Sequence, residues 1–582
     1  MSDRLVSEIR REMSRVAIAE DPLEEGYSTL HVAARLDLVD AVSKLVQEGA
    51  SVDIRSRSGE TPLHVACRSG SFRCASELAR VGADLSACSE CGATPLFLAC
   101  SRGHAAIVRD LLARGARACA GRLLPLHDAC ERGDVGIVRE LLSGGASAAA
   151  VREGDGRNAV HAAVLSGSAD VLRAILGAAT RASLDALGRD GYSPLMLAAT
   201  RDDVESARAL LSAGCDIHLQ NAHWMDAMCV ASLLGRVQFV LELLENGARV
   251  SPWHLCASCL NGHEEVMDVL LRAGGAGALG QSSYGFGALH VAAAKGRTGM
   301  AVALCRAGAP LEARCAAATV ADLCGPYRVM GATPLHFACI NGHTETADRL
   351  LALGANPNQT TNIGCTPLMM ASANGHPETA LALVASGADI DTRDSAGFAA
   401  IHFATCAGDR ETVLKLLRLG ADPDVADLYG ETPVHKACLV HKAHLGGQDD
   451  APCGHVGILR DLLRAGARHS VATSDKGETP LHLACVVAQR ECAIELIQSG
   501  ASLSARDADG RTPLHRAFDP AIVRALLDGG ADVGAADNVG ETPLSIAEKI
   551  ADALPRGRDV LEMMRARAAR VGPSAAAAED RP

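Results

Sequence analysis

The stretch Thr333-Pro-Leu-His-Phe-Ala-Cys-Ile-Asn-Gly-His343 decides the fold, because versions of it recur along almost the whole chain. Its opening Thr-Pro-Leu-His is repeated in full from Thr61, Thr479 and Thr512, and altered copies between them mostly keep a spacing of 33 residues. Such a period indicates a protein built from stacked repeats. We count sixteen copies, whose first residues are Ser28, Thr61, Thr94, Leu124, Asn158, Ser193, Asp226, Ser251, Gly287, Thr333, Thr366, Ala399, Thr432, Thr479, Thr512 and Thr542.

The repeated residues have clear local roles. Thr is a favourable N-cap and Pro suits the first helical position, so each copy predicts the start of a short helix. Glycines such as Gly342 end that helix, and an apolar second helix such as Glu345–Leu353 follows. A polar turn then leads to the next copy. Neither helix can bury its apolar face alone, so neighbouring copies must stack.

This pattern resembles the ankyrin repeat family over roughly residues 27–573. The resemblance implies an all-α solenoid of about 16 stacked helix pairs with β-hairpin-like fingers. It also implies that the histidine of each copy bonds back to the Thr and to neighbouring backbone. That structural role passes to His64, His336, His482 and His515, and to the histidines at the same position in other copies, His31, His127, His161, His290, His402 and His435.

The predicted organisation is one long array with short additions. Residues 1–26 predict an N-terminal capping helix, residues 27–573 the array, and residues 574–582 a disordered tail. Insertions at 315–330 and 441–453 interrupt the spacing. The copy before Trp253 has almost no finger, so 221–260 is a candidate junction between two sub-arrays. The alternative is a drifted repeat whose two tryptophans fill the gap.

Composition and charge exclude several functions. The net charge of -13 argues against general nucleic-acid binding, which needs basic stripes. No apolar run approaches the ~20 residues that span a bilayer, so we expect no direct membrane insertion. The 21 cysteines without a signal peptide indicate reduced thiols, and hence a cytoplasmic protein, with the nucleus as a second location, that is not secreted. We expect a monomer, although the sequence leaves the oligomeric state open.

The sequence predicts neither an enzyme nor a cofactor. The histidines of the copies recur with the fold rather than with any site, and no phosphate-binding glycine motif is present. The best metal candidate is the group His441, His444, Cys453 and His455, whose side chains are of the types that bind zinc. A solvated loop explains this group better, because His455 also belongs to the repeated Gly-His motif.

Most of the partner-binding candidates are aromatic residues outside the repeated helices. In the ankyrin family, finger tips and first-helix faces line a concave binding surface, where aromatics would serve as low-entropy anchors. The alternative, that these rings stack on neighbouring fingers, stays open. The candidates are Tyr192, Tyr284, Phe286, Tyr327, Arg328, Phe398, Trp224 and Trp253.

The predicted function is a non-enzymatic scaffold or adaptor that binds one or more proteins on the concave ankyrin surface. The alternative is a substrate-recognition subunit of a ubiquitin ligase of the suppressor-of-cytokine-signalling-box or F-box type. The former box needs a Leu-x-x-x-Cys element and a Leu-Pro element after the array. No cysteine follows Cys492, and the late Leu554-Pro555 lies inside the last copy, so no such box is evident.

Overall fold

The computed structural model describes residues 26–118, 123–281, 285–316, 330–439, 454–551 and 557–571. These residues belong to two compact units, which are described separately. Unit 1 comprises Met1–Val250 with Glu265–Ala273, and unit 2 comprises Ser251–Glu264 with Gly274–Pro582. The predictions of a capping helix at 1–26 and of a disordered tail at 574–582 fall almost wholly outside the described residues.

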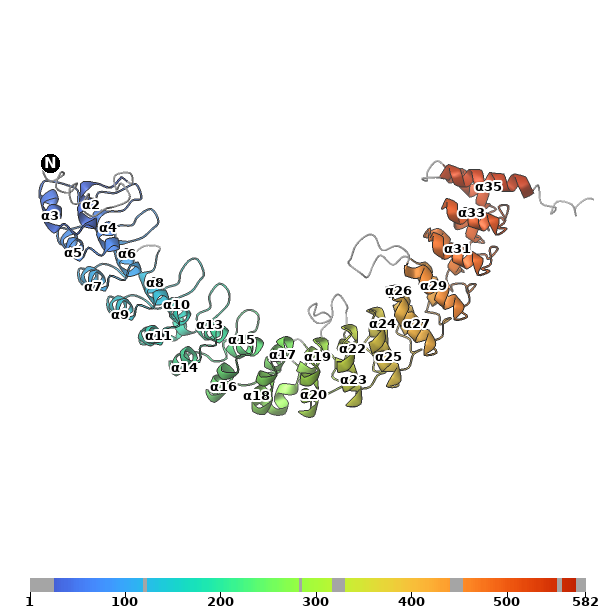
Figure 1. The fold of residues 1–582 in the computed structure, drawn as a ribbon, viewed down its shortest axis with the longest axis horizontal. Coiled ribbons are helices and arrows are strands. Elements are labelled where there is room, and N and C mark those ends of the chain that lie inside the picture. The colour runs from blue at the N-terminus through green and yellow to red at the C-terminus, as the bar shows by residue number, and fades with distance from the viewer. Residues whose placement is uncertain are drawn as a thin grey trace, which may run out of the picture. The chain divides into compact units, whose positions relative to one another are not determined.

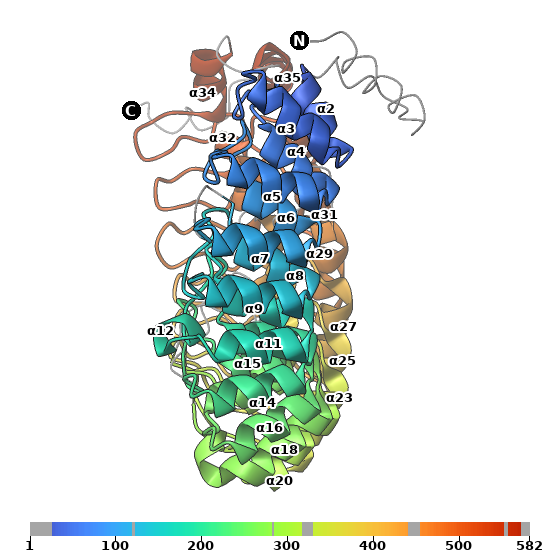
Figure 2. The same ribbon diagram turned by 90° about the vertical axis from the view of Figure 1, so that its left-hand side faces the viewer.

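Unit 1 is a stack of helix pairs (Figures 1 and 2). The first helices of its repeats are α2 (Thr29–Arg35), α4 (Pro62–Ser69), α6 (Pro95–Ser101), α8 (Pro125–Arg132), α10 (Ala159–Ser166), α13 (Pro194–Arg201) and α15 (Ala227–Leu234). The second helices are α3 (Val39–Gln47), α5 (Phe72–Arg80), α7 (Ala105–Ala113), α9 (Val135–Ser143), α11 (Ala169–Leu176), α14 (Val204–Ser212) and α16 (Val237–Glu245), with α12 (Arg181–Leu184) between two repeats and α18 (Glu264–Gly274) mostly in this unit.

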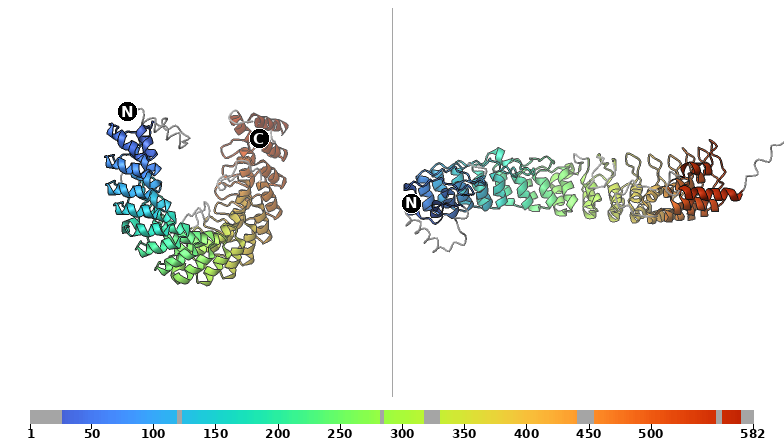
Figure 3. Two further views of the ribbon diagram at one scale, coloured as in Figure 1. Left: turned by 60° about the vertical axis from the view of Figure 1, so that its left-hand side comes forward. Right: turned by 90° about the horizontal axis from the view of Figure 1, so that it is seen from above.

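Unit 2 repeats the same arrangement, and its fingers project along one edge of the helices (Figure 3). Its first helices are α17 (Pro252–Asn261), α19 (Ala288–Ala294), α22 (Pro334–Ile340), α24 (Pro367–Ala373), α26 (Ala400–Ala407), α28 (Pro433–Cys438), α30 (Pro480–Val486), α32 (Pro513–Arg516) and α34 (Pro543–Ile550). The other helices are η1 (Gly275–Leu279), α20 (Thr298–Arg306), α23 (Thr344–Ala352), α25 (Pro377–Ala385), α27 (Arg410–Arg418), α29 (Gly454–Arg464), α31 (Arg490–Gln498), α33 (Pro520–Asp528) and α35 (Gly557–Val571).

The first residue of every predicted copy is the N-cap of a first helix. Thr61 precedes Pro62 at the first helical position, and Gly70 ends the helix in the left-handed conformation at φ 75°. Copies without the histidine keep the cap, as where Thr94 Oγ1 accepts a hydrogen bond from Phe97 N. The described residues contain helices and turns but no strand beyond one isolated β-bridge, which confirms the predicted all-α solenoid.

The core lies between the two helix layers of successive repeats. In α4, the side chains of Leu63, Ala66 and Cys67 are fully buried, and α7 contributes Val108 and Leu111 in the same way. These small and medium side chains permit close helix packing with few aromatic rings. Burial raises the pKa of thiols in this layer, so cysteines such as Cys67 behave as neutral apolar residues.

In the copies that carry it, the repeat histidine ties the first helix to the next repeat. The Thr61 N–H donates to His64 Nδ1 at 3.1 Å, so the ring proton lies on Nε2. His64 Nε2 then donates to the carbonyl of Ala93, the residue before the next N-cap, at 3.0 Å. His336, His482 and His515 make the equivalent bonds to Cys365, Arg511 and Glu541. Each imidazole is therefore a bridge between two repeats.

Replacing His336 by Ala should destabilise the protein by about 3 kcal/mol, because two buried backbone groups lose their partners and a cavity opens. The exposed His218 offers a control, and His218→Ala should change the free energy of unfolding by less than about 0.5 kcal/mol. Urea unfolding followed by circular dichroism measures both. Equal effects of the two substitutions would contradict the bridging role.

Stability should also fall with acid in a defined window. Burial lowers the pKa of His290, His336, His402 and His435 to about 4. The unfolded chain therefore takes up protons below about pH 6.5, before the folded chain does. Stability should be full above pH 7 and fall between pH 6.5 and 4, by up to about 1.4 kcal/mol per pH unit for each histidine. Urea midpoints measured from pH 7.5 to 4.5 test this, and a flat profile would refute it.

Candidate functional site

The fingers, the segments that join a second helix to the next N-cap, stack directly on one another. Each tip is a tight turn, as where Ser56 N donates to Glu60 O at 2.9 Å. The tip residue two positions before the N-cap is commonly a glycine with positive φ, such as Gly397 at 84°. A Cβ at Gly397 would lie 2.7 Å from Leu428 N in the next finger. Glycine is required here because the next backbone approaches so closely.

Unit 2 carries exposed apolar side chains on three of four successive finger tips; the tip between Ile363 and Leu428 carries Ala396 instead. Met330, Ile363, Leu428 and Tyr429 are 44%, 51%, 70% and 60% exposed. We call these four residues the finger-tip row. Backbone bonds hold it in place: Asn362 N donates to Met330 O at 3.0 Å, Ser395 N to Ile363 O at 3.0 Å, and Leu428 N to Ala396 O at 3.1 Å. Exposed apolar side chains that lie together are a typical feature of interaction surfaces.

A buried charge cluster supports the end of the finger-tip row. Lys436 Nζ lies 2.8 Å from Asp427 Oδ2, contacts Glu431 as well, and sits 4.5 Å from the centre of the Phe398 ring. Burial opposes the ammonium charge, but hydrogen bonds to the two carboxylates outweigh it and raise the pKa of Lys436. Asp427 Oδ1 also accepts from the backbone N–H of Tyr429 at 2.9 Å. The cluster therefore fixes the tip that presents Leu428 and Tyr429.

Phe286, a predicted partner anchor, is a core residue. Its side chain is 2% exposed, and its ring packs edge-on against His290 and Phe337 with centroids 6.2 and 5.8 Å apart. The prediction that Phe286 contacts a partner is corrected accordingly, because a ring enclosed by the next first helix cannot reach another molecule. For Phe286 the alternative prediction holds, namely that the ring packs inside the array.

The other candidate residues differ in exposure. Tyr192 and Phe398 are half-buried, and the carbonyl of Tyr192 accepts the bridge from His161 at 3.1 Å. Trp224 is 64% exposed, whereas Trp253 at the start of α17 is half-buried. Tyr284, Tyr327 and Arg328 lie outside the described residues, so the predicted binding stretch around them stays a prediction.

The weak metal candidate is likewise a prediction without a structural counterpart. His441, His444 and Cys453 lie outside the described residues, as does the side chain of His455. Within the described part of the chain, no three His, Cys, Asp or Glu side chains come close enough to hold a metal ion. In the same part of the chain, no helix combines the length and apolarity needed to cross a bilayer.

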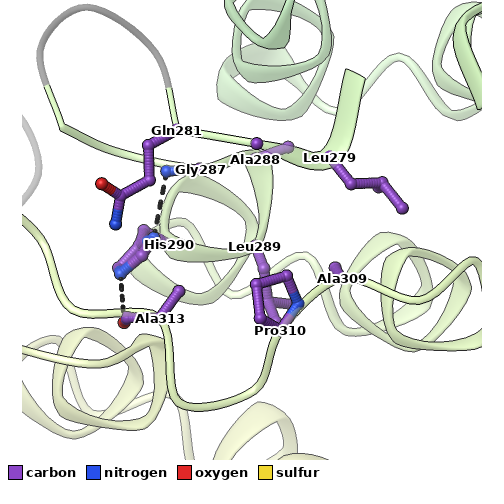
Figure 4. Close-up of a pocket in the computed structure, with 10 residues that line it drawn as sticks. Leu279, Gln281, Gly287, Ala288, Leu289, His290, Ala309, Pro310 and Ala313 are labelled. Atoms are coloured by element: carbon purple, nitrogen blue, oxygen red, sulfur yellow. Dashed lines mark hydrogen bonds between the residues drawn. The ribbon is translucent and has the colours of Figure 1, made fainter. Parts of the chain in front are cut away.

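A pocket of about 250 Å³ lies in unit 2 beside the bridge of His290 (Figure 4). His290 Nδ1 accepts from Gly287 N at 3.1 Å and Nε2 donates to Ala313 O at 2.9 Å. Gln281 Nε2 is bonded to Arg314 O at 2.6 Å. Burial lowers the pKa of His290 to about 4, so the ring is neutral at pH 7. Its polar groups are occupied by the fold, and this histidine is a structural one.

Sequence reasoning missed most of the finger-tip row. Met330 and Ile363 stand three residues before an N-cap, where neighbouring copies carry Ala396 and Tyr429. When the copies are aligned on their N-caps, this position holds an apolar residue in four successive copies. That pattern in the sequence could have indicated the row. Leu428 is one residue earlier and had no such signal.

Comparisons with known proteins agree with the repeated architecture. The model "Ankyrin repeats (3 copies)" matches residues 13–87, 30–121, 76–152, 126–221, 317–394 and 451–537, and the model "Ankyrin repeat" matches 396–428. The neurogenic locus Notch protein of Drosophila melanogaster is 36% identical over 98 residues, 16% of this chain and 4% of that protein. Neurogenic locus notch homolog protein 2 of Homo sapiens is 36% identical over 107 residues, which are 18% of this chain and 4% of that protein.

The match to these curated relatives spans only about 4% of their length. Among solved structures, the human ASB11 ankyrin repeat domain is 28% identical with a TM-score of 0.34, covering 39% of this chain and 100% of that one. Ankyrin repeats are in general protein–protein interaction modules, and their fold is typically non-catalytic. With family models matched over more than half of its residues, the chain belongs to the ankyrin repeat family.

Proposed function

We propose that this protein is a non-enzymatic interaction scaffold that binds a partner protein on the finger-tip row and the adjoining first helices. The carrying observation is the exposure of Met330, Ile363, Leu428 and Tyr429 on three of four successive, hydrogen-bonded fingers. Covering such side chains favours association, and rigid tips lose little entropy on binding. The partner that fits is a protein surface with apolar side chains facing several fingers.

The polar chemistry of the repeats supports a binding role over catalysis. The repeat imidazoles use both ring nitrogens in fixed bonds, as in His336 and His482, and burial lowers their pKa. They are therefore committed to joining repeats and are unavailable as general bases.

We further propose a cytoplasmic location, with the nucleus as a second one, and a monomeric scaffold. Thiols are buried in the helix layers, and burial raises the pKa of Cys74 in α5 and of Cys130 in α8 to about 12. Their raised pKa keeps these thiols protonated at pH 7, and free thiols suit a reducing compartment. The net charge of -13 favours protein partners over nucleic acid.

Two charges placed in the finger-tip row should abolish partner binding. In Ile363→Asp/Leu428→Asp, carboxylates would have to be desolvated in an apolar interface, so enrichment of the partner should drop at least tenfold. Affinity capture of the tagged full chain from cells, with quantitative mass spectrometry, measures the change.

The control is Leu353→Asp, which replaces another exposed apolar residue of unit 2 (41%) just beyond the end of α23, outside the row. It should keep the wild-type partners, and circular dichroism should show both variants folded. An unchanged partner list for the double variant would refute this site.

A further inference from the structure

The residue four positions after each N-cap is charged in only three of the sixteen copies. It is Asp128 in α8, Lys436 in α28 and Arg516 in α32, whereas the other thirteen copies carry an apolar residue there. Both cations are paired inside unit 2. Lys436 Nζ lies 2.8 Å from Asp427 Oδ2, and Arg516 Nη2 lies 2.7 Å from Asp507 Oδ2. In unit 2 the fold itself therefore supplies the counter-charge for a charged residue at this position.

Asp128, in unit 1, has no such ion-pair partner among the described residues. Its Oδ2 atom is buried without a hydrogen-bond partner, and its half-buried side chain is open to solvent at Oδ1. Arg132, one turn further along α8, lies 3.6 Å from Asp134 Oδ2 instead. Arg152, in the next finger, pairs with Glu131 at 2.8 Å. Because the loss of hydration outweighs the attraction of Arg132, burial raises the pKa of Asp128.

The helices on either side of Asp128 hold no cation. Helices α6 and α10 flank α8 in the first-helix layer of unit 1 (Figure 1), and neither contains an arginine, lysine, aspartate or glutamate. Their residues at the same position are Leu98, which is half-buried, and Ala162, which is 2% exposed. An unpaired carboxylate in such apolar surroundings lowers the stability of the fold. Asp128 therefore does not serve folding, and the missing counter-charge is what a partner can bring.

We propose that Asp128 pairs with an arginine side chain of a partner protein that lies across α6, α8 and α10. The guanidinium group donates to Oδ1, the accessible oxygen, and its charge neutralises the carboxylate, as carboxylates neutralise Lys436 and Arg516 in unit 2. The apolar stem of the arginine packs on Leu98. Arginine fits better than lysine, because its guanidinium is more weakly hydrated and enters apolar surroundings at a lower cost. The site lies in unit 1 and does not depend on the finger-tip row of unit 2.

A phage-displayed library of random linear peptides provides the probe. It is selected on the immobilised full-length protein after the peptides that bind the Asp128→Asn variant have been removed. The peptides that remain should share an arginine beside apolar residues. The anisotropy of a fluorescein-labelled selected peptide gives its dissociation constant. Replacing its arginine by citrulline, a neutral residue of similar shape, should weaken binding to the wild-type protein at least about tenfold, because a desolvated charge pair is lost.

Two variants locate the binding on α8. Asp128→Asn should bind the arginine and citrulline peptides equally, because the charge that distinguishes them is gone. Glu131→Gln, which removes the neighbouring carboxylate that pairs with Arg152, should keep the full difference between the two peptides. No peptide left after the subtraction, no shared arginine, or an undiminished effect of citrulline in Asp128→Asn would each overturn the proposal.

Urea unfolding at pH 7 separates a binding role from a folding role. Asp128→Asn should raise the urea midpoint, because a neutral amide of similar size costs less to bury than a carboxylate. A lower midpoint would show that Asp128 is paired within the chain, and it would overturn the proposal. A wild-type dimer that Asp128→Asn turns into a monomer, measured by sedimentation, would also overturn it, since the arginine would then belong to a second copy.

Discussion

The structure depends on one bond, the imidazole bridge between a helix N-terminus and the finger of the following repeat. His64 accepts from its own N-cap through Nδ1 and donates to Ala93 of the next repeat through Nε2. Both atoms are buried, so neither bond can be replaced by water. The bridge fixes the first helix, the finger and the register between neighbours together. In the copies that carry the histidine, the finger of the following repeat takes its position from this bond.

Charged pairs on the second helices add little to that register. Arg109 pairs with Glu140 and Arg460 with Glu495 across adjacent repeats, at 2.7 and 2.6 Å. The arginine side chains are 69% and 44% exposed, and pairs of this kind contribute about 0–1 kcal/mol. A buried unsatisfied donor or acceptor costs about 1–3 kcal/mol. The neutral histidines therefore contribute more to the register between repeats than the exposed ion pairs do.

The fold could be predicted because its signals are local. Thr-Pro at a helix start and glycine at its end act within a few residues, and each predicted copy begins at an observed N-cap. Helix α12, capped by Thr180 and Ser183, could not be predicted from the repeat pattern, because it interrupts the repeat and has no counterpart in other copies. The burial of Phe286 could not be predicted either, since it depends on contact with Phe337, which lies beyond an insertion in the sequence. Exposure is set by neighbours distant in sequence, so the candidate site was predicted less well than the fold.

Each tip glycine is constrained by the repeat that follows it in the chain, and not by the repeat that precedes it. Gly397 is glycine because of the backbone at Leu428, so the identity of a residue in one repeat is imposed by the repeat that comes after it. Loss of a finger releases the residue upstream from this constraint. Trp224, two residues before the N-cap Asp226, adopts a φ of 59° at such a tip, and only residues 246–251 connect the two helices α16 and α17 that follow. In evolutionary terms, a deletion in one repeat opens a position for variation in the repeat before it. A new side chain can thus arise at a tip next to a shortened segment while the histidine bridges of other repeats stay intact.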